Sequence, residues 1–225
     1  MKKIGMVVAV EIDAVLNKFG VPKKEIPFIA HSVYEYKLGE HTLFVINSGV
    51  GQIAATMATQ FLITEFEVDL IVNFGVVGGL TPEMEVTKTC IVESVVHYDF
   101  DTSSLDKCEV GRYLEYPSIY IPTSKQIMDK ALDIEPSLKK VVCASGDKFI
   151  DGKKEKERLH QLYKADICEM EAAGIVLTCN KYKTPCLLIK TVSDGISGGA
   201  EEFVNTLHST AETCLEITIA VLSEI

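Results

Sequence analysis

The sequence predicts one α/β domain in which a largely parallel sheet carries helices on both faces. Short apolar runs rich in β-branched residues alternate along the chain with longer segments of helical spacing, which is the pattern of such folds. The length of 225 residues suits one domain, and we expect it to span residues 1–225. With 47% hydrophobic and 24% charged residues, the chain has the composition of a globular protein and not of a disordered one.

The first half of the chain predicts buried strands and one hairpin. Residues 4–10 form a continuous apolar, β-branched run, which indicates a strand buried on both faces. The helix that follows ends at Gly20, with Pro22 just beyond it as a stop signal. A short turn around Gly39 separates two strand-like runs and predicts the hairpin. We expect strands at 4–10, 34–38, 42–46, 69–74 and 89–97, and helices at 11–19 and 54–66.

The second half opens on a long polar stretch, residues 99–117, after which the alternation resumes. Loops of this length in compact domains are usually functional or mobile. Beyond it we expect strands at 118–121, 139–144 and 185–191, and helices at 125–132, 153–163, 169–182 and 200–222. The sequence shows no internal repeat and no linker.

Charge and composition exclude several classes of function. The formal charge is 22 − 32 = −10, which repels phosphate backbones and argues against nucleic-acid binding. No stretch approaches the ~20 apolar residues that span a bilayer, so we expect no membrane association. The seven cysteines include no C-x-x-C pair and fit a reducing cytoplasm. The five histidines are scattered, so no metal site is expected.

The predicted strand ends carry glycine turns and carboxylates. Ligands of such sheets bind at the carboxyl ends of the strands. There the sequence places Glu11 and Asp13 after the first strand, glycine turns at 48–51 and 75–79, and Asp194 after the last. Carboxylates in these positions suit acid–base work on a leaving group and a water. Each feature alone also fits a structural role, such as a tight corner or an acid at a helix start.

Five motifs in order along the chain resemble the nucleoside phosphorylase/hydrolase superfamily. They are S-G-V-G at 48–51, N-F-G-V-V-G-G-L at 73–80, S-G-D-K-F-I at 145–150, E-M-E-A-A at 169–173 and V-S-D at 192–194. Within the superfamily the pattern is most similar to the 5′-methylthioadenosine/S-adenosylhomocysteine nucleosidases. The resemblance implies a single-domain three-layer α/β/α sandwich with a mixed, mostly parallel sheet. It also implies a cytoplasmic homodimer that hydrolyses the N-ribosidic bond of a 5′-substituted adenine nucleoside, without cofactor or metal.

The same resemblance implies three catalytic residues. Asp194 matches the acid that protonates purine N7, and Glu171 matches the glutamate that binds the ribose hydroxyls. Asp13 falls where nucleosidases carry the carboxylate that positions the attacking water, although that residue is usually a glutamate. The shorter side chain leaves open whether the loop compensates, a second water bridges, or Glu11 assists.

Further residues are implied to bind the substrate. Phe149 matches the aromatic side chain stacked on the base, and Ile150 the residue whose backbone reads the adenine edge. Met170 matches the residue that lines the sugar. The complete set implied is Val50, Val76, Val77, Gly78, Phe149, Ile150, Glu169, Met170 and Ser193. Residues 99–117, with Tyr98, Phe100, Leu105 and Tyr113, are the candidate loop that closes the partner's 5′ pocket.

Three alternatives remain at this stage. A purine nucleoside phosphorylase would need arginines to grip phosphate, and the chain has only Arg112 and Arg158, neither at the expected positions. Val76 also lacks the hydroxyl that often binds phosphate there. A nucleoside-binding or sensor protein with weak catalysis is the second alternative, and a hydrolase of another purine nucleoside the third. Lys190 could pair with a nearby carboxylate or equally reach solvent.

Overall fold

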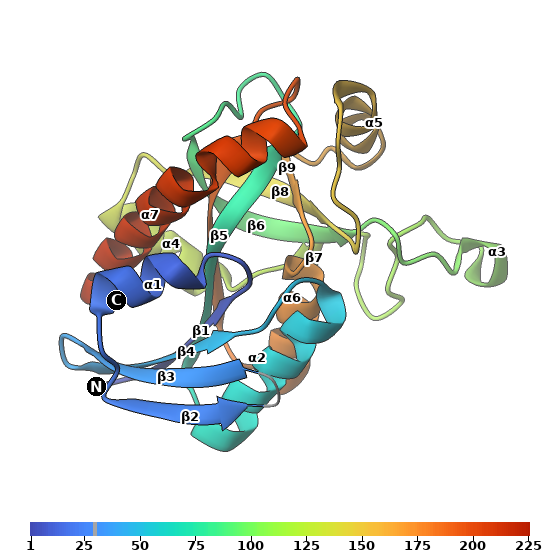
Figure 1. Ribbon diagram of the computed structural model, residues 1–225. Coiled ribbons are helices and arrows are strands. Elements are labelled where there is room, and N and C mark those ends of the chain that lie inside the picture. Colours follow the sequence, from blue (N-terminus) through green and yellow to red (C-terminus); the bar gives the residue numbers. More distant parts are fainter. Residues whose placement is uncertain (29–30) are drawn as a thin grey trace.

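The computed structural model describes residues 1–28 and 31–225, which form an α/β fold around one mixed sheet (Figure 1). In chain order the elements are β1 (Lys3–Val8), α1 (Ile12–Phe19), β2 (Lys24–Phe28), β3 (His31–Leu38), β4 (His41–Asn47), α2 (Gln52–Phe66), β5 (Leu70–Gly79), β6 (Thr89–His97), α3 (Ser103–Asp106), β7 (Ile121–Pro122), α4 (Lys125–Ile134), β8 (Lys139–Ser145), α5 (Lys153–Tyr163), β9 (Ile167–Glu169), α6 (Ala172–Tyr182), β10 (Cys186–Asp194) and α7 (Ala200–Glu224). In the part of the chain that is described, no helix is long and apolar enough to cross a membrane.

The sheet combines a parallel centre with antiparallel additions. Strands β4, β1, β5 and β10 pair in parallel, and so do β6, β8 and β9. The two groups join through antiparallel pairs, β10 with β6 and β5 with β9, so these strands close on one another. An antiparallel edge of β2, β3 and β4 extends the other side. The α/β class and the mixed sheet predicted from the sequence are therefore confirmed.

Helices cover both faces of the sheet. Helices α1, α4 and α7 share one apolar core with β1, β5 and β10, and α2 and α6 pack together on the other face (Figure 1). The apolar, β-branched strands supply both cores, since β5 and β10 are buried along their whole length. Helix α5 packs against a third, smaller core through Leu159 and Tyr163. The sheet is thus buried on both sides, and its ligand-binding edge is left at the strand ends.

The element predictions differ from the structure mainly at short strands. Strands β2 and β9 were not expected from the sequence, because they have only five and three residues and little periodicity. The helix expected at 169–182 starts only at Ala172, because residues 167–169 extend as β9 beside β5 and β8. The polar stretch 99–117 contains only the four-residue α3 and projects away from the body (Figure 1).

Local backbone features position the strand ends. The register between β10 and β5 shifts between Val192 and Asp194, so Ser193 forms an irregularity that redirects the following carboxylate. A side chain at Gly78 would come within 3.2 Å of the Asp194 carboxylate and 3.0 Å of the Cys168 thiol. Glycine at this position lets β5 pass close to the end of β10.

Candidate functional site

One cavity of about 250 Å³ lies at the carboxyl ends of β1, β5 and β10. The structure brings to it nearly all the residues predicted from the motifs. Its lining includes Val50, Val76, Val77, Gly78, Phe149, Ile150, Glu169, Met170, Glu171, Ser193 and Asp194, together with Glu11, Lys148, Cys168 and Phe203. The walls are largely apolar, with carboxylates at several points, and this arrangement makes the cavity the candidate active site.

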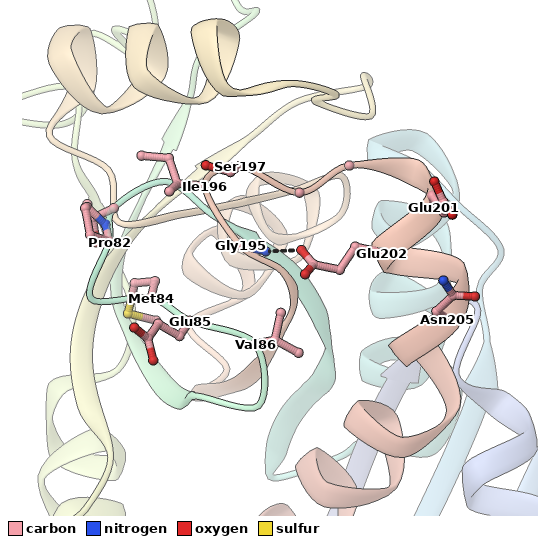
Figure 2. A pocket seen from close by; sticks show the side chains of 13 residues that line it. Pro82, Met84, Glu85, Val86, Gly195, Ile196, Ser197, Glu201, Glu202 and Asn205 are labelled. Carbon is pink, nitrogen blue, oxygen red and sulfur yellow. Dashed lines mark hydrogen bonds between the residues drawn. The ribbon is translucent and has the colours of Figure 1, made fainter.

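A larger surface hollow, of about 840 Å³, lies beside it between residues 81–86 and 195–205 (Figure 2). Its lining includes the carboxylates of Glu85, Glu201 and Glu202, but neither a basic nor an aromatic side chain. In Figure 2 the Glu202 carboxylate turns to the Gly195 N–H and accepts its hydrogen bond at 2.8 Å. Chemistry is therefore assigned to the smaller cavity, and the hollow is the outer side of the loop that follows Asp194.

The prediction for Asp13 is wrong in its position. Asp13 is exposed in the first turn of α1 and does not line the cavity. Glu11, at the start of that helix, lines it instead, and its Oε1 accepts the Val76 N–H at 2.8 Å. Two helical positions differ by about 200° around the axis, so only one of these acids can point inward. The buried Ala14 and Val15 lie three and four positions after Glu11, a spacing that could have revealed its inward face.

The carboxyl group of Glu11 is strongly affected by its surroundings. The side chain is buried against Gly75, where an added Cβ would lie 2.7 Å from Oε1. Burial raises the pKa of Glu11, while the charge of Lys190 and the hydrogen bond from Val76 lower it, and burial prevails. A carboxylate with a raised pKa is a better proton acceptor near neutral pH than an exposed one.

The two glutamates of the E-M-E-A-A motif do different work. Glu169 ends β9 and caps α6, since its Oε2 accepts the N–H groups of Glu171 at 3.0 Å and Ala172 at 2.8 Å. Glu171 turns toward the glycine turn, where Oε1 accepts the Gly51 N–H at 2.9 Å. Burial, and then the neighbouring charge of Glu169, raise the pKa of Glu171 to about 7. The helix expected at 169–182 would have contained both residues, but Glu169 ends β9 and Glu171 precedes the first residue of α6.

Lys190 is the counter-ion of this carboxylate group. Its side chain is buried, and its Nζ lies 3.4 Å from Glu169 Oε2. Burial alone would lower the pKa of Lys190, but the carboxylates of Glu169, Glu171 and Glu11 raise it above its ordinary value. The sequence left open whether Lys190 pairs with a carboxylate or reaches solvent, and in the structure it pairs with Glu169.

The glycine turn before α2 is tied to this motif by a buried amide. Gln52 donates from Nε2 to Ser145 Oγ at 2.7 Å, and its Oε1 accepts the Gly174 N–H at 2.6 Å. One side chain thus joins α2, β8 and α6. Such fully satisfied buried networks fix the relative positions of the elements that they connect.

Asp194 lies at the end of β10, where it pairs with Gly78 of β5. Its Oδ1 accepts the Ser193 hydroxyl at 2.9 Å, and its Oδ2 accepts a hydrogen bond from Lys156 Nζ at 2.5 Å. Near it, Phe149 contacts Phe203 edge to face, with ring centroids 5.4 Å apart, and remains 40% exposed. A partly exposed aromatic ring beside a buried carboxylate suits a flat, polar heterocycle.

Lys156 was not among the site residues expected from the sequence. It belongs to the helix predicted at 153–163, which is rich in charged residues, yet its side chain is fully buried. Lys156, Leu159 and Tyr163 recur at helical spacing on one face, and that pattern could have identified the lysine as inward-facing.

Comparison with known proteins agrees with this geometry. A model of the phosphorylase superfamily matches residues 3–223. An aminodeoxyfutalosine nucleosidase of Helicobacter pylori strain J99 is 29% identical, with both chains covered completely. A 5′-methylthioadenosine/S-adenosylhomocysteine nucleosidase of Tolumonas auensis is 28% identical over 99% of this chain and all of its own.

Solved structures give the same two descriptions. The native futalosine hydrolase of Helicobacter pylori strain 26695 superposes with a TM-score of 0.93 at 28% identity, over 100% of this chain and 98% of that one. A Helicobacter pylori 5′-methylthioadenosine/S-adenosylhomocysteine nucleosidase, bound to a pyrrolidine-containing adenine analogue, also has a TM-score of 0.93. It is 29% identical, over 100% and 99% of the two chains.

Removing the buried cation tests the electrostatics of the site. Lys190→Met should lower the free energy of unfolding by about 3–5 kcal/mol at pH 8, because it leaves buried carboxylates unpaired. The loss should shrink as the pH falls below 7, because the folded-state pKa of Glu171 is raised and protonation removes the uncompensated charge. Denaturant unfolding curves from pH 5 to 8 measure this. Lys140→Met, at an exposed lysine of β8, is the control and should have little effect; a pH-independent loss in Lys190→Met would contradict the argument.

Proposed function

Because the chain belongs to the phosphorylase superfamily, we propose that it hydrolyses the N-ribosidic bond of 5′-substituted adenine nucleosides and releases adenine. The observation that carries the proposal is the placement of carboxylates around a single apolar cavity. Asp194, Phe149, Glu171 and Glu11 all line it, with Glu11 held by the Val76 N–H and Glu171 by the Gly51 N–H of the glycine turn. This is the distribution needed by a reaction that protonates a leaving base and stabilises a sugar cation.

The adenine ring fits the wall formed by Phe149, Ile150 and Asp194. Phe149 offers a ring face for stacking, and Ile150 offers backbone groups for the adenine edge. Asp194, in its protonated form, donates a proton to purine N7 as the bond to ribose breaks. The base then leaves as neutral adenine, and a positioned general acid of this kind typically contributes about 10²–10⁴-fold to the rate.

The ribose fits between Met170 and Glu171. Bond cleavage builds positive charge on the sugar, and the Glu171 carboxylate stabilises that charge while it accepts hydrogen bonds from the ribose hydroxyls. One oxygen of Glu171 is held by the Gly51 N–H, so the side chain is positioned before the substrate binds. Such preorganisation favours the transition state more than the ground state.

Glu11 is the proposed acceptor of a proton from the attacking water. It has the burial, the raised pKa and the fixed orientation that this role needs, and Val76 N–H holds one of its oxygens. Lys190 balances the charge of the group without filling the cavity, since it is absent from the lining. The water-holding role that the resemblance implied for Asp13 is thus assigned here to Glu11.

The basic side chains at and around the cavity favour hydrolysis over phosphorolysis. The cavity lining contains Lys148 but no arginine, whose planar fork best matches phosphate oxygens. Arg158 is paired with Glu155, and Arg112 belongs to the projecting segment. Water is therefore the proposed nucleophile.

The 5′-substituent has two candidate classes, one for each group of relatives. Relatives named as 5′-methylthioadenosine/S-adenosylhomocysteine nucleosidases and as aminodeoxyfutalosine nucleosidases match this chain almost equally well. The apolar side chains of Val10, Val50 and Phe203 at the cavity accept either a thioether or an aromatic 5′-group. We rank the uncharged methylthio group first, because these three side chains are apolar and none of them could pair with the carboxylate that a homocysteine or other acidic substituent carries.

A homodimer would complete the 5′ end of the pocket. Val50, Ile53 and Met57 on and before α2 are 52%, 75% and 44% exposed, and Leu105 in the projecting segment is 81% exposed. Exposed apolar side chains of this kind, of which Val50 lines the cavity, suit a self-complementary interface. The projecting segment is stiffened by Phe100 and Tyr113, whose rings stack 4.2 Å apart, so it can reach a second copy.

Product analysis tests the proposed function. We expect adenine and a free sugar from 5′-methylthioadenosine, S-adenosylhomocysteine or aminodeoxyfutalosine, at the same rate with and without inorganic phosphate, because water is the nucleophile. Chromatography of the base and the sugar measures both products. A phosphate requirement with a sugar-1-phosphate product would identify a phosphorylase, and tight binding without adenine release would identify a nucleoside sensor.

A matched pair of variants tests which acid serves the water. Glu11→Gln should reduce adenine release at least a hundredfold while nucleoside still binds, because the amide cannot accept a proton. Asp13→Asn should keep nearly wild-type turnover and lose only the small favourable interaction with the helix dipole, about 0.3–1 kcal/mol. Steady-state kinetics beside thermal melts compares them. Turnover lost in Asp13→Asn and kept in Glu11→Gln would return the role to Asp13.

The pH dependence tests Glu171. Its carboxylate must be ionised to stabilise the sugar cation, and its pKa is raised to about 7, so kcat/KM should fall on the acid side with a midpoint near pH 7. Glu171→Gln should be slow and should lack this acid limb. If the limb persists unchanged in that variant, it belongs to another group, and Glu11 would be the first to examine.

A further inference from the structure

Lys156 is a fully buried lysine that lies behind the candidate acid. It belongs to the first turns of α5, and its side chain is 0% exposed, although it does not line the cavity. Its Nζ donates to Asp194 Oδ2 at 2.5 Å, to the Gly195 carbonyl at 2.7 Å and to the Asp194 carbonyl at 3.2 Å. An ammonium group has three N–H donors, so these three acceptors match the charged form of the lysine.

Lys156 and Asp194 are each other's counter-ions. Four elements contribute the groups that surround Lys156 and Asp194. They are the Cys168 thiol of β9, the Ser193 hydroxyl of β10, Gly78 of β5, and Glu202 of α7, whose carboxylate accepts the Gly195 N–H. Burial raises the pKa of Cys168 to about 12, so this thiol is neutral. A buried charge without a partner is very costly, so the ammonium and the Asp194 carboxylate stabilise each other as ions.

The peptide after Asp194 is held from both sides. Lys156 donates to the Asp194 carbonyl of this peptide at 3.2 Å, and Glu202 accepts its Gly195 N–H at 2.8 Å. The Ser193 hydroxyl fixes the other carboxylate oxygen. These contacts leave Asp194 with one orientation, set by α5 and α7 as well as by its own strand.

We propose that Lys156 is a positioning residue that holds Asp194 as a carboxylate in the empty cavity, so that the proton later given to purine N7 enters from solvent as the nucleoside binds. This inference rests on the proposed function. Asp194 takes up one proton when N7 arrives beside it, and donates it to N7 as the electron pair of the sugar–base bond passes to adenine. The attacking water loses its proton to Glu11, which returns it to solvent, so protons balance over the cycle.

The arrangement has a catalytic reason. Once Asp194 has given its proton to N7 it is again a carboxylate, and the Lys156 ammonium, 2.5 Å from its Oδ2, stabilises that charge. The same contact holds Asp194 as a carboxylate in the free enzyme. Removing the cation should weaken both effects.

The experiment compares neutral and charged replacements of Lys156. In Lys156→Met and Lys156→Gln, kcat for adenine release should fall about tenfold or more while KM changes little, because the carboxylate that forms when Asp194 gives up its proton has lost its counter-ion. Lys156→Arg, which retains the charge, should keep most of the wild-type kcat. Lys154→Met, an exposed lysine on the same helix, is the matched control. Thermal melts show which variants are folded, and the glutamine variant retains hydrogen-bond donors if the methionine variant is unstable.

A binding measurement decides the charge of Asp194 without turnover. The probe is 9-deazaadenosine, a C-nucleoside with an uncleavable bond and a hydrogen on N7, which suits an ionised carboxylate and opposes a protonated one. In the neutral Lys156 variants its affinity should fall at least tenfold at pH 6 relative to the wild type and recover as the pH rises. Glu171 and Glu11 titrate in both proteins, so the comparison removes their contribution.

The outcomes separate the two claims. A neutral variant with the wild-type kcat and the wild-type affinity profile would show that Lys156 only ties α5 to β10, and would overturn the inference. Failure of the wild type to release adenine from any nucleoside would instead refute the proposed function, while the affinity series would still report the charge of Asp194.

Discussion

The burial of several carboxylates around one small apolar cavity is the constraint on which this site depends. Glu11, Glu169, Glu171 and Asp194 are each 8% exposed or less, and an unpaired buried charge would cost several kcal/mol. Two buried lysines that do not line the cavity compensate these charges. Lys190 is the counter-ion of the three glutamates and Lys156 that of Asp194, so the cavity remains free for a ligand.

The fold supplies these charges from separate directions. Parallel pairing of β1, β5 and β10 brings the ends of distant segments to one edge of the sheet, which is where α/β proteins bind ligands. The acids then come from the start of α1, the end of β9, the start of α6 and the end of β10, and each is held by a backbone N–H or a hydroxyl. Rigid elements rather than long loops therefore set the geometry.

The sequence predicted the parts of this site that are written as motifs. Asp194 and Glu171 lie in short, specific patterns, and the alternation of strands and helices predicted the α/β class. It failed where the answer depends on which side of a helix faces inward. Asp13 was chosen by linear position, yet the helix begins at Ile12 and turns Glu11 toward Val76. Lys156 was not predicted because a segment rich in charged residues is usually exposed to solvent, and only the spacing of its few inward-facing residues reveals a buried face. Strand β9 was not predicted because three residues are too few to show a period.

The two lysines give the carboxylates of one cavity different properties. Lys190 is shared among three acids, so burial prevails over its charge and the pKa values of Glu11 and Glu171 rise, which suits groups that accept a proton or respond near neutral pH. Lys156 contacts a single carboxylate at 2.5 Å and also fixes the backbone on which that carboxylate stands. The cations are thus unevenly distributed around a cavity of about 250 Å³, with one lysine for three glutamates and one for Asp194 alone. Glu11 keeps the raised pKa that suits a proton acceptor, whereas Asp194 is fixed in one orientation by a lysine of its own.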